Sequence, residues 1–212
     1  MVGEVVWRPA LSRPVPAGVP APTLKFQNVA VHPGEIVAII GVAGNGQTEL
    51  AATLRDTLPR RITAHIPEDR TRDGVVAEMT IAENLALLTD TPPEELIAKF
   101  DIRARGPHQR AGSLSGGNQQ KLLLARELDR QPEIIVAAEP TRGLDIESTR
   151  FVHEQLRAAA QRGAAILMIT SDLDEAFSLA DGIHVIYRSR LGDRLAPAEA
   201  AQRAGMLMAG LQ

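Results

Sequence analysis

The chain has 212 residues, a formal net charge of −3 and no cysteine. This length suffices for one α/β domain with a sizeable core and an inserted subdomain. The near-balanced charge marks no nucleic-acid or lipid-binding surface, and the aromatic content of 3% argues against base stacking. The lack of cysteine excludes disulfides and thiolate metal sites and fits a reducing compartment. No apolar run reaches membrane-spanning length, so we expect any membrane association to come through a partner.

The N-terminal residues divide into two parts. Residues 4–7 predict a short edge strand, whereas residues 9–22 contain five prolines and no helical periodicity, which indicates a loop or extended linker. Glu4 and Arg8 stand where a signal peptide would need an apolar stretch. We therefore expect a cytosolic protein.

Two strand patterns follow, separated by a turn at residues 32–34. Residues 23–31 alternate as one strand, and residues 35–40 form a nearly continuous apolar run of the kind buried on both faces of a parallel sheet. The candidates for burial in the first strand are Leu24, Phe26, Val29 and Val31.

Residues 41–48 (GVAGNGQT) lie between this apolar strand and a helical segment, which is the context of a phosphate-binding P-loop. The spacing G-x-x-x-x-G-x-[ST] matches, but Gln47 replaces the lysine, so the point charge aimed at the β- and γ-phosphates is missing. Backbone N–H groups could still cradle phosphates and Thr48 could still bind Mg²⁺ weakly. A glycine loop without a phosphate role is the alternative. The candidate phosphate-binding residues are Gly41, Gly44, Asn45, Gly46, Gln47 and Thr48.

Two short helices are predicted after a charged turn at residues 66–70 (IPEDR). The first covers residues 79–85, where Thr80 is the N-cap and Glu83 completes a capping box. The second begins at residues 92–97, because proline is tolerated in a first helical turn.

Residues 114–121 (LSGGNQQK) predict a turn followed directly by a helix. Ser115 suits an N-cap, and Gly116 and Gly117 let the backbone approach a ligand. Such a helix N-terminus presents free N–H groups and the positive end of a dipole, which suits a phosphate, although an ordinary capped helix is the alternative. The apolar spacing that follows comes from Leu122, Leu123, Ala125 and Leu128.

The last third of the chain alternates strands and helices. Buried strands are predicted at residues 134–138, 164–170 and 182–187, and an amphipathic helix covers residues 146–161. Glu139 ends the first of these strands, at the edge where open α/β sheets keep their chemistry, although a solvent-facing carboxylate is the alternative. Asp172 caps a helix that runs through Ala180, with Glu175 in capping-box register, and the alanine-rich tail to residue 212 is predicted to be helical.

The stretch at residues 114–121, about twenty residues before the strand that ends in Glu139, resembles the signature of ABC-transporter ATP-binding domains. Its NQQK continuation and the PEDR at residues 67–70 are similar to the C-terminal ATPase half of importers for simple sugars and nucleosides. The resemblance covers residues 24–212. It implies an α/β P-loop NTPase fold, with a mainly parallel sheet flanked by helices and a helical subdomain that carries the signature.

The resemblance also implies the domain plan, a single domain over residues 1–212. The helical subdomain is expected to be short and to lack a β-hairpin after the P-loop helix, because Gln47 and Ser115 are only 68 positions apart. Residues 207–210 resemble the natural C-terminal end of such domains. The predicted parts are an edge strand and linker (1–23), the P-loop core (24–60), the Q-loop region with the helical subdomain (61–113), the signature, Walker B, D-loop and switch core (114–190), and a tail (191–212).

Site roles follow from the same resemblance. Glu139 stands where the catalytic base would polarise the attacking water, Glu68 lies in the Q-loop, and Asp145 is the D-loop aspartate. Ala138 occupies the place of the metal-binding Walker B aspartate, and Ser171 that of the switch histidine. The signature residues expected to face the ATP of a partner are Ser115, Gly116, Gly117 and Gln119.

In this family two ATPase domains dimerise head to tail and sandwich ATP between the P-loop of one and the signature of the other. We therefore expect ATP and Mg²⁺ as cofactors, and a second ATPase domain, permease subunits and, indirectly, a substrate-binding protein as partners. The expected location is cytoplasmic, peripheral on the inner face of the membrane. The chain's own P-loop site should hydrolyse ATP very slowly, and only Trp7 or Phe26 offers a remote ring for adenine.

Two other functions remain open at this point. One is a regulatory module of the same fold that does not transport, and the other is a decayed domain with little nucleotide binding. A Rossmann-type oxidoreductase is unsupported, because the glycine spacing at residues 41–46 is wrong for dinucleotides.

Overall fold

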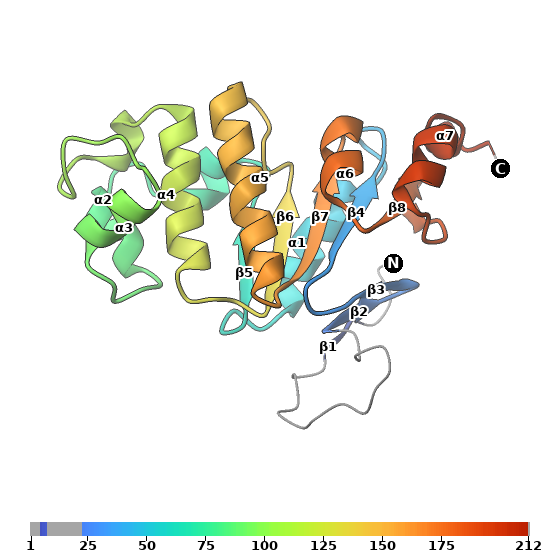
Figure 1. Ribbon diagram of the computed structural model, residues 1–212, viewed down its shortest axis with the longest axis horizontal. Helices are drawn as coiled ribbons and strands as arrows, with labels where there is room; N and C mark the ends of the chain where they lie inside the picture. The colour runs from blue at the N-terminus through green and yellow to red at the C-terminus, as the bar shows by residue number, and fades with distance from the viewer. Residues whose placement is uncertain (1–4, 8–22, 212) are drawn as a thin grey trace.

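The computed structural model describes residues 5–7 and 23–211, which are organised around a six-stranded sheet in the order β5-β6-β7-β4-β8-β9 (Figure 1). All pairings from β5 to β8 are parallel, and β8–β9 is antiparallel. Ile, Val, Leu and Ala dominate the central strands, which are buried along their whole length because helices cover both faces of the sheet. The strands are β5 (Thr63–Ile66), β6 (Ile134–Ala138), β7 (Ala165–Thr170), β4 (Ile36–Ile40), β8 (Gly182–Tyr187) and β9 (Arg190–Leu191).

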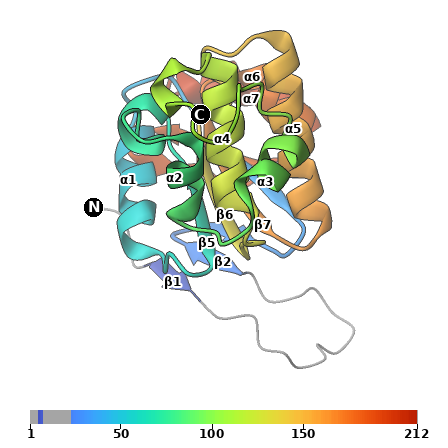
Figure 2. The ribbon, with the colours of Figure 1, turned by 90° about the vertical axis from the view of Figure 1, so that its left-hand side faces the viewer.

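Helices lie on the two faces of this sheet, as Figure 2 shows with α1 on one side and α5 and α6 on the other. Strand β4 illustrates the alternation: Val37 and Ile39 pack with α1, whereas Ala38 and Ile40 pack with α6 and α7. The helices that flank the sheet are α1 (Gln47–Thr57), α4 (Gly116–Leu128), α5 (Ile146–Gln161), α6 (Leu173–Leu179) and α7 (Pro197–Met208). This arrangement confirms the predicted α/β fold with a mainly parallel sheet.

A second, three-stranded antiparallel sheet consists of β1 (Val5–Trp7), β2 (Leu24–Phe26) and β3 (Val29–Val31). The prediction of one strand over residues 23–31 is therefore wrong, because the chain reverses at Gln27, whose φ is 46°, and pairs Leu24 with Val31. The burial predicted for Leu24, Phe26, Val29 and Val31 is confirmed. A strand is present over residues 5–7 of the predicted edge strand, whereas the linker predicted at residues 9–22 falls entirely outside the described residues.

The helical subdomain contains α2 (Ile81–Ala86), α3 (Pro93–Lys99) and the N-terminal part of α4. The predicted capping box of α2 is present, since Thr80 Oγ1 accepts a hydrogen bond from the Glu83 N–H and the Glu83 carboxylate accepts one from the Thr80 N–H. Within the described chain no strand lies between α1 and β5, as expected for a shortened subdomain. The described residues contain no helix that is long and apolar enough to cross a membrane.

Candidate nucleotide-binding site

The P-loop connects β4 to α1 at the carboxyl edge of the sheet. Gly44 and Gly46 have φ values of 87° and 106°, a left-handed conformation that glycine adopts at little cost. A Cβ on Gly46 would lie 2.7 Å from Ser189 Oγ, in the turn between β8 and β9. The same turn donates two hydrogen bonds to Asn45 of the P-loop. The Arg188 N–H donates to the Asn45 side-chain oxygen, and the Ser189 N–H donates to the Asn45 backbone oxygen. The loop is therefore shaped by the adjacent hairpin.

Gln47 lacks the positive charge of a lysine, and its side chain also forms hydrogen bonds within the P-loop. Its side chain is only 8% exposed and folds back over the loop, where Nε2 donates to the Val42 carbonyl at 3.0 Å. Its Oε1 accepts from the Asn45 N–H at 3.1 Å, so it occupies one of the backbone donors that a phosphate would use. A phosphate entering this loop has to compete with that internal amide.

Thr48, at the first turn of α1, is exposed and donates a hydrogen bond from Oγ1 to Glu68 Oε2 at 3.3 Å. The other carboxylate oxygen of Glu68 pairs with the guanidinium of Arg142, beyond the end of β6. Ala138 lines the same pocket, which has a volume of about 830 Å³, and contributes only a methyl group. The hydroxyl and carboxylate at Thr48 and Glu68 are the oxygen donors that Mg²⁺ prefers, so this pair fits the metal.

The signature turn is built as predicted. Ser115 is the N-cap of α4, and its Oγ accepts from the N–H and the side-chain amide of Asn118 at 3.5 and 2.9 Å. A Cβ on Gly117 would lie 2.3 Å from Ser148 Oγ, and one on Gly116 would lie 2.7 Å from a terminal nitrogen of Arg70. A side chain at Gly117 would therefore crowd the short Ser148 side chain, whereas one at Gly116 would meet only the flexible end of Arg70.

The Gln119 side chain bonds to the segment that precedes α4. Its Nε2 donates to the Ala111 carbonyl at 3.3 Å, inside the helical subdomain. Its predicted contact with the ATP of a partner would require the side chain to turn outward, so that role remains a prediction.

Glu139 and Ser171 meet at the ends of neighbouring strands β6 and β7. The φ of Glu139 is 45°, and its Oε1 accepts from the backbone N–H of Ser171 at 2.8 Å. Ser171 therefore contacts the candidate catalytic carboxylate through its backbone, a contact that does not depend on the side chain at that position.

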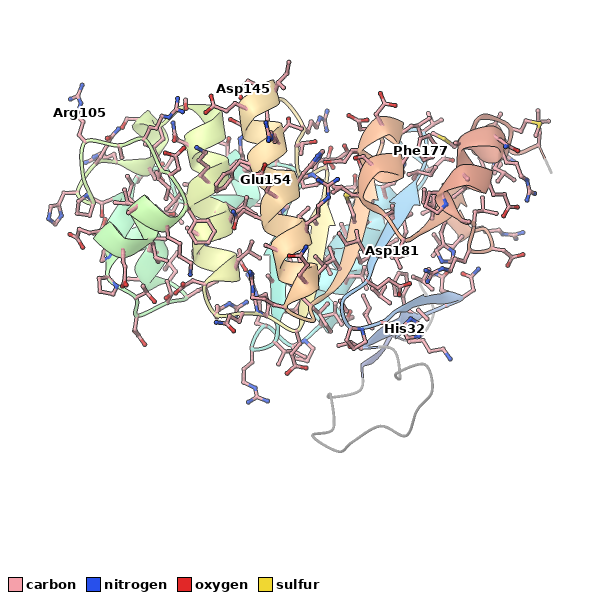
Figure 3. All side chains as sticks on the ribbon, in the orientation of Figure 1. His32, Arg105, Asp145, Glu154, Phe177 and Asp181 are labelled. Atoms are coloured by element: carbon pink, nitrogen blue, oxygen red, sulfur yellow. The ribbon has the colours of Figure 1, made fainter. Side chains whose placement is uncertain are left out.

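Asp145 lies at the N-terminal end of α5, where Figure 3 labels it. Its side chain caps the helix by accepting from the Ser148 N–H at 2.7 Å, and this hydrogen bond holds the pKa of Asp145 below its usual value. The next residue, Ile146, is 89% exposed. The predicted contact of Asp145 with a partner remains a prediction.

A buried carboxylate beside the site was missed by sequence reasoning. Glu175 was assigned to a capping box, and its N–H does donate to Asp172 Oδ1, but its carboxylate turns inward. It accepts from the hydroxyls of Thr170 and Thr141 at 2.7 and 2.8 Å and lies 3.1 Å from His153 Nε2. The capping box is therefore only half formed, because the carboxylate joins the loop after β6 to α5 and β7.

The rings proposed for adenine do not supply a stacking surface in the described part of the chain. Phe26 is fully buried in the core and is not available to a ligand, so this suggestion is wrong. The side chain of Trp7 lies outside the described residues.

The P-loop and the signature belong to different parts of the sheet. The P-loop follows β4, whereas α4 packs on β5, three strands away. At the usual spacing between strands, this separation is roughly 14 Å. The structure therefore holds the signature turn apart from the chain's own P-loop.

Comparisons with known proteins agree with this geometry. Residues 24–142 match the ABC transporter family, more than half of the chain, and the chain belongs to that family. It is 37% identical to the nucleoside import ATP-binding protein NupA of Lactococcus lactis subsp. cremoris over 88% of this chain and 45% of the relative. It is 36% identical to the guanosine import ATP-binding protein NupO of Bacillus subtilis, over 89% of this chain and 45% of the relative.

A sugar importer is also among the relatives. The chain is 32% identical to the glucose import ATP-binding protein TsgD13 of Haloferax volcanii over 86% of this chain and 41% of that protein. The chain thus spans less than half the length of these curated relatives.

Solved structures share the fold. An ATP-binding subunit of an ABC transporter has a TM-score of 0.67 at 23% identity and covers 87% of each chain. A dimeric post-hydrolysis ATP-binding cassette bound to ADP and Pi has a TM-score of 0.67 at 19% identity, over 82% of this chain and 90% of that one.

Proposed function

We propose that this chain is an ATP-binding domain of an importer for simple sugars or nucleosides, and that it completes the ATP site of a second ATPase domain. The observation that carries the proposal is the contrast between an intact, capped signature helix at Ser115 and a P-loop in which Gln47 fills part of the phosphate cradle. The names of the nucleoside and sugar import relatives support the class of transporter.

The P-loop half-site and the signature half-site of this chain are expected to differ in their contribution to ATP hydrolysis. The chain's own site lacks the lysine, the Walker B aspartate and the switch histidine, whose places are taken by Gln47, Ala138 and Ser171. Losing one group that stabilises phosphate charge typically costs a few kcal/mol, about 10²–10³ in rate. Hydrolysis at this site is therefore very slow, whereas the N–H groups of the signature remain available to a partner's ATP.

The test is to mix the purified chain with an ATPase domain that has an intact P-loop and comes from the same importer. The chain alone is expected to show little ATPase activity, and the mixture to be active. Ser115→Arg should remove that activity because the side chain blocks the signature. Gln161→Arg, at the exposed far end of α5, is the matched control and should leave it unchanged. Brisk hydrolysis by the chain alone that Glu139→Gln abolishes would overturn the proposal.

The import role also predicts a permease contact near residues 66–73. Because the sequence contains no cysteine, Arg72→Cys, whose parent side chain is 73% exposed, gives a single cross-linking site. We expect it to cross-link to a permease subunit in membranes, with Arg150→Cys on exposed α5 as the control. Assembly with a partner ATPase domain without any permease contact would favour the regulatory module, and no nucleotide binding in any mixture would favour a decayed domain.

A further inference from the structure

We propose that Arg70 is part of the signature half-site, where its guanidinium binds the γ-phosphate of ATP held by a partner domain. The inference rests on the proposed function in one respect, since it takes the signature to close on a partner's ATP. It adds a side-chain cation to a half-site whose other phosphate donors are the Ser115 hydroxyl and the backbone N–H groups of the following turn. Arg70 itself lies outside the signature motif.

Arg70 begins η1 (Arg70–Gly74), the helical turn that follows β5 and packs on the signature helix α4. A Cβ on Gly74 would lie 3.2 Å from Leu123 Cδ2 of α4. At the other end of η1, the guanidinium of Arg70 lies beside Gly116, the first residue of α4. A Cβ on Gly116 would lie 2.7 Å from Arg70 Nη2 and 3.5 Å from its Cζ. The signature turn therefore has a guanidinium alongside its first helical residue.

The guanidinium is held from one side only. Arg70 Nη1 donates to the Arg142 carbonyl at 2.9 Å, and Nε is buried without a hydrogen-bond partner in the described chain. Nη2, the nitrogen that lies nearest to Gly116, makes no hydrogen bond to any described residue. An arginine side chain carries five N–H donors in a planar fork. The Arg142 carbonyl uses one of them, and the Nη2 donors stay available to a ligand.

The charge of Arg70 is not neutralised within the described chain. Arg70 forms no ion pair with a described residue, and the carboxylates that lie nearest to it in sequence have other partners. These are Glu68 with Arg142, Asp73 with Arg72, and Asp69 with the backbone N–H groups of Thr71 and Arg72.

The N-terminal end of α4 is positive as well, because its first N–H groups lack helical acceptors. A cation beside such an end is electrostatically unfavourable unless an anion lies with it. Asp145 is nearby, 3.8 Å from where a Cβ on Gly117 would lie, but its carboxylate accepts from the Ser148 N–H and caps α5. A phosphate at this turn would neutralise the helix end and the guanidinium together, and a guanidinium can donate two N–H bonds to it.

The experiment measures association rather than turnover. The full chain is titrated with an ATPase domain that has an intact P-loop and comes from the same importer, in Mg²⁺ with either a non-hydrolysable ATP analogue or ADP. Analytical ultracentrifugation gives the dissociation constant. Arg70→Gln should raise that constant about 10- to 100-fold in the analogue, the usual effect of losing a hydrogen bond to a charged group. It should leave any association in ADP unchanged, because ADP lacks the γ-phosphate.

Two further variants sharpen the readout. Arg70→Lys keeps the charge but loses the planar fork, so its loss in the analogue should be smaller than that of Arg70→Gln. Arg105→Gln is the matched control, because it removes the same charge from an exposed side chain that Figure 3 shows at the outer side of the helical subdomain. It should leave association unchanged in both nucleotides. Urea unfolding verifies the fold of each variant.

The proposal is overturned if Arg70→Gln associates like the wild type in the analogue, or if it weakens association equally in both nucleotides, because Arg70 would then only support the fold. If Arg70→Gln does not fold, Arg70→Lys decides by the same criterion. Ser115→Arg separates this inference from the proposed function. Loss of association with Ser115→Arg but not with Arg70→Gln overturns the role of Arg70 alone, whereas no association of the wild type in the analogue overturns both.

Discussion

At the scale of single residues, we expect position 47 to set the affinity of the P-loop for phosphate. The Gln47 amide bridges the Val42 carbonyl and the Asn45 N–H, and it brings no positive charge. We expect Gln47→Lys to raise ATP affinity about 10- to 100-fold, since hydrogen bonds to charged groups contribute about 1.5–3 kcal/mol. Titration with a fluorescent ATP analogue measures the change.

Gln47→Leu separates the two effects of this residue. It removes the amide hydrogen bonds to the Val42 carbonyl and the Asn45 N–H without adding charge, so it shows how far loss of these two bonds alone improves binding. Equal gains for the leucine and lysine variants would contradict the importance of the missing cation.

At the scale of elements, the helical subdomain depends on how its short helices begin. Helix α2 has only six residues and begins with the reciprocal capping box of Thr80 and Glu83. We expect Thr80→Ala to lower the free energy of unfolding by about 1 kcal/mol, as is typical for loss of an N-cap side chain. Urea unfolding measures this, with Thr53→Ala as the control.

Thr53 is a suitable control because its hydroxyl only bonds back to the Glu49 carbonyl on the exposed side of α1. Its removal should change stability by less than about 0.5 kcal/mol. Similar losses for both variants would show that the capping box adds nothing specific.

At the scale of the whole molecule, stability should depend on pH through His65 of β5. Burial, and then the nearby arginines 60, 55 and 130, lower the pKa of His65 from 6.5 to about 4. The unfolded chain therefore binds more protons than the folded one between about pH 6.5 and 4, and folding stability decreases as pH falls through that window.

His65→Gln removes this titration. We expect its free energy of unfolding, measured in urea from pH 7 to pH 4.5, to fall less steeply than that of the wild type. His184, whose pKa is also lowered by burial, remains in both proteins and leaves a shared background. Parallel curves for the two proteins would be inconsistent with a neutral buried His65.

Much of the architecture was predictable because its signals are local. The buried strands β4, β6 and β7 are continuous apolar runs, and α5 shows helical spacing of its buried residues. The signature and P-loop positions were recognisable from glycine spacing. The hairpin of β2 and β3 was missed because its turn at Gln27 carries no glycine or proline, and the only signal is a one-position shift of the apolar residues between Phe26 and Val29.

The contacts within the site were less predictable because they join residues distant in sequence. Nothing near Glu68 indicates that it meets Thr48 and Arg142, and nothing near Glu175 indicates that it turns toward Thr141. These contacts depend on strand order, which brings the ends of β5, β6 and β7 to one edge. Residue types therefore indicated the kind of site, and only the fold showed which side chains contact one another in it.

The strand order has a further consequence for how the protein is made. Strand β4 is synthesised before both of its neighbours, β7 and β8, so that Ile36 must wait for Ile166. Parallel sheets with such distant pairings fold slowly, because long loops must close before any contact stabilises them. During synthesis the apolar β4 and the P-loop behind it therefore remain without their sheet until β7, which carries Ile166, has also been made. The P-loop thus reaches its final setting only after segments far along the chain have joined it.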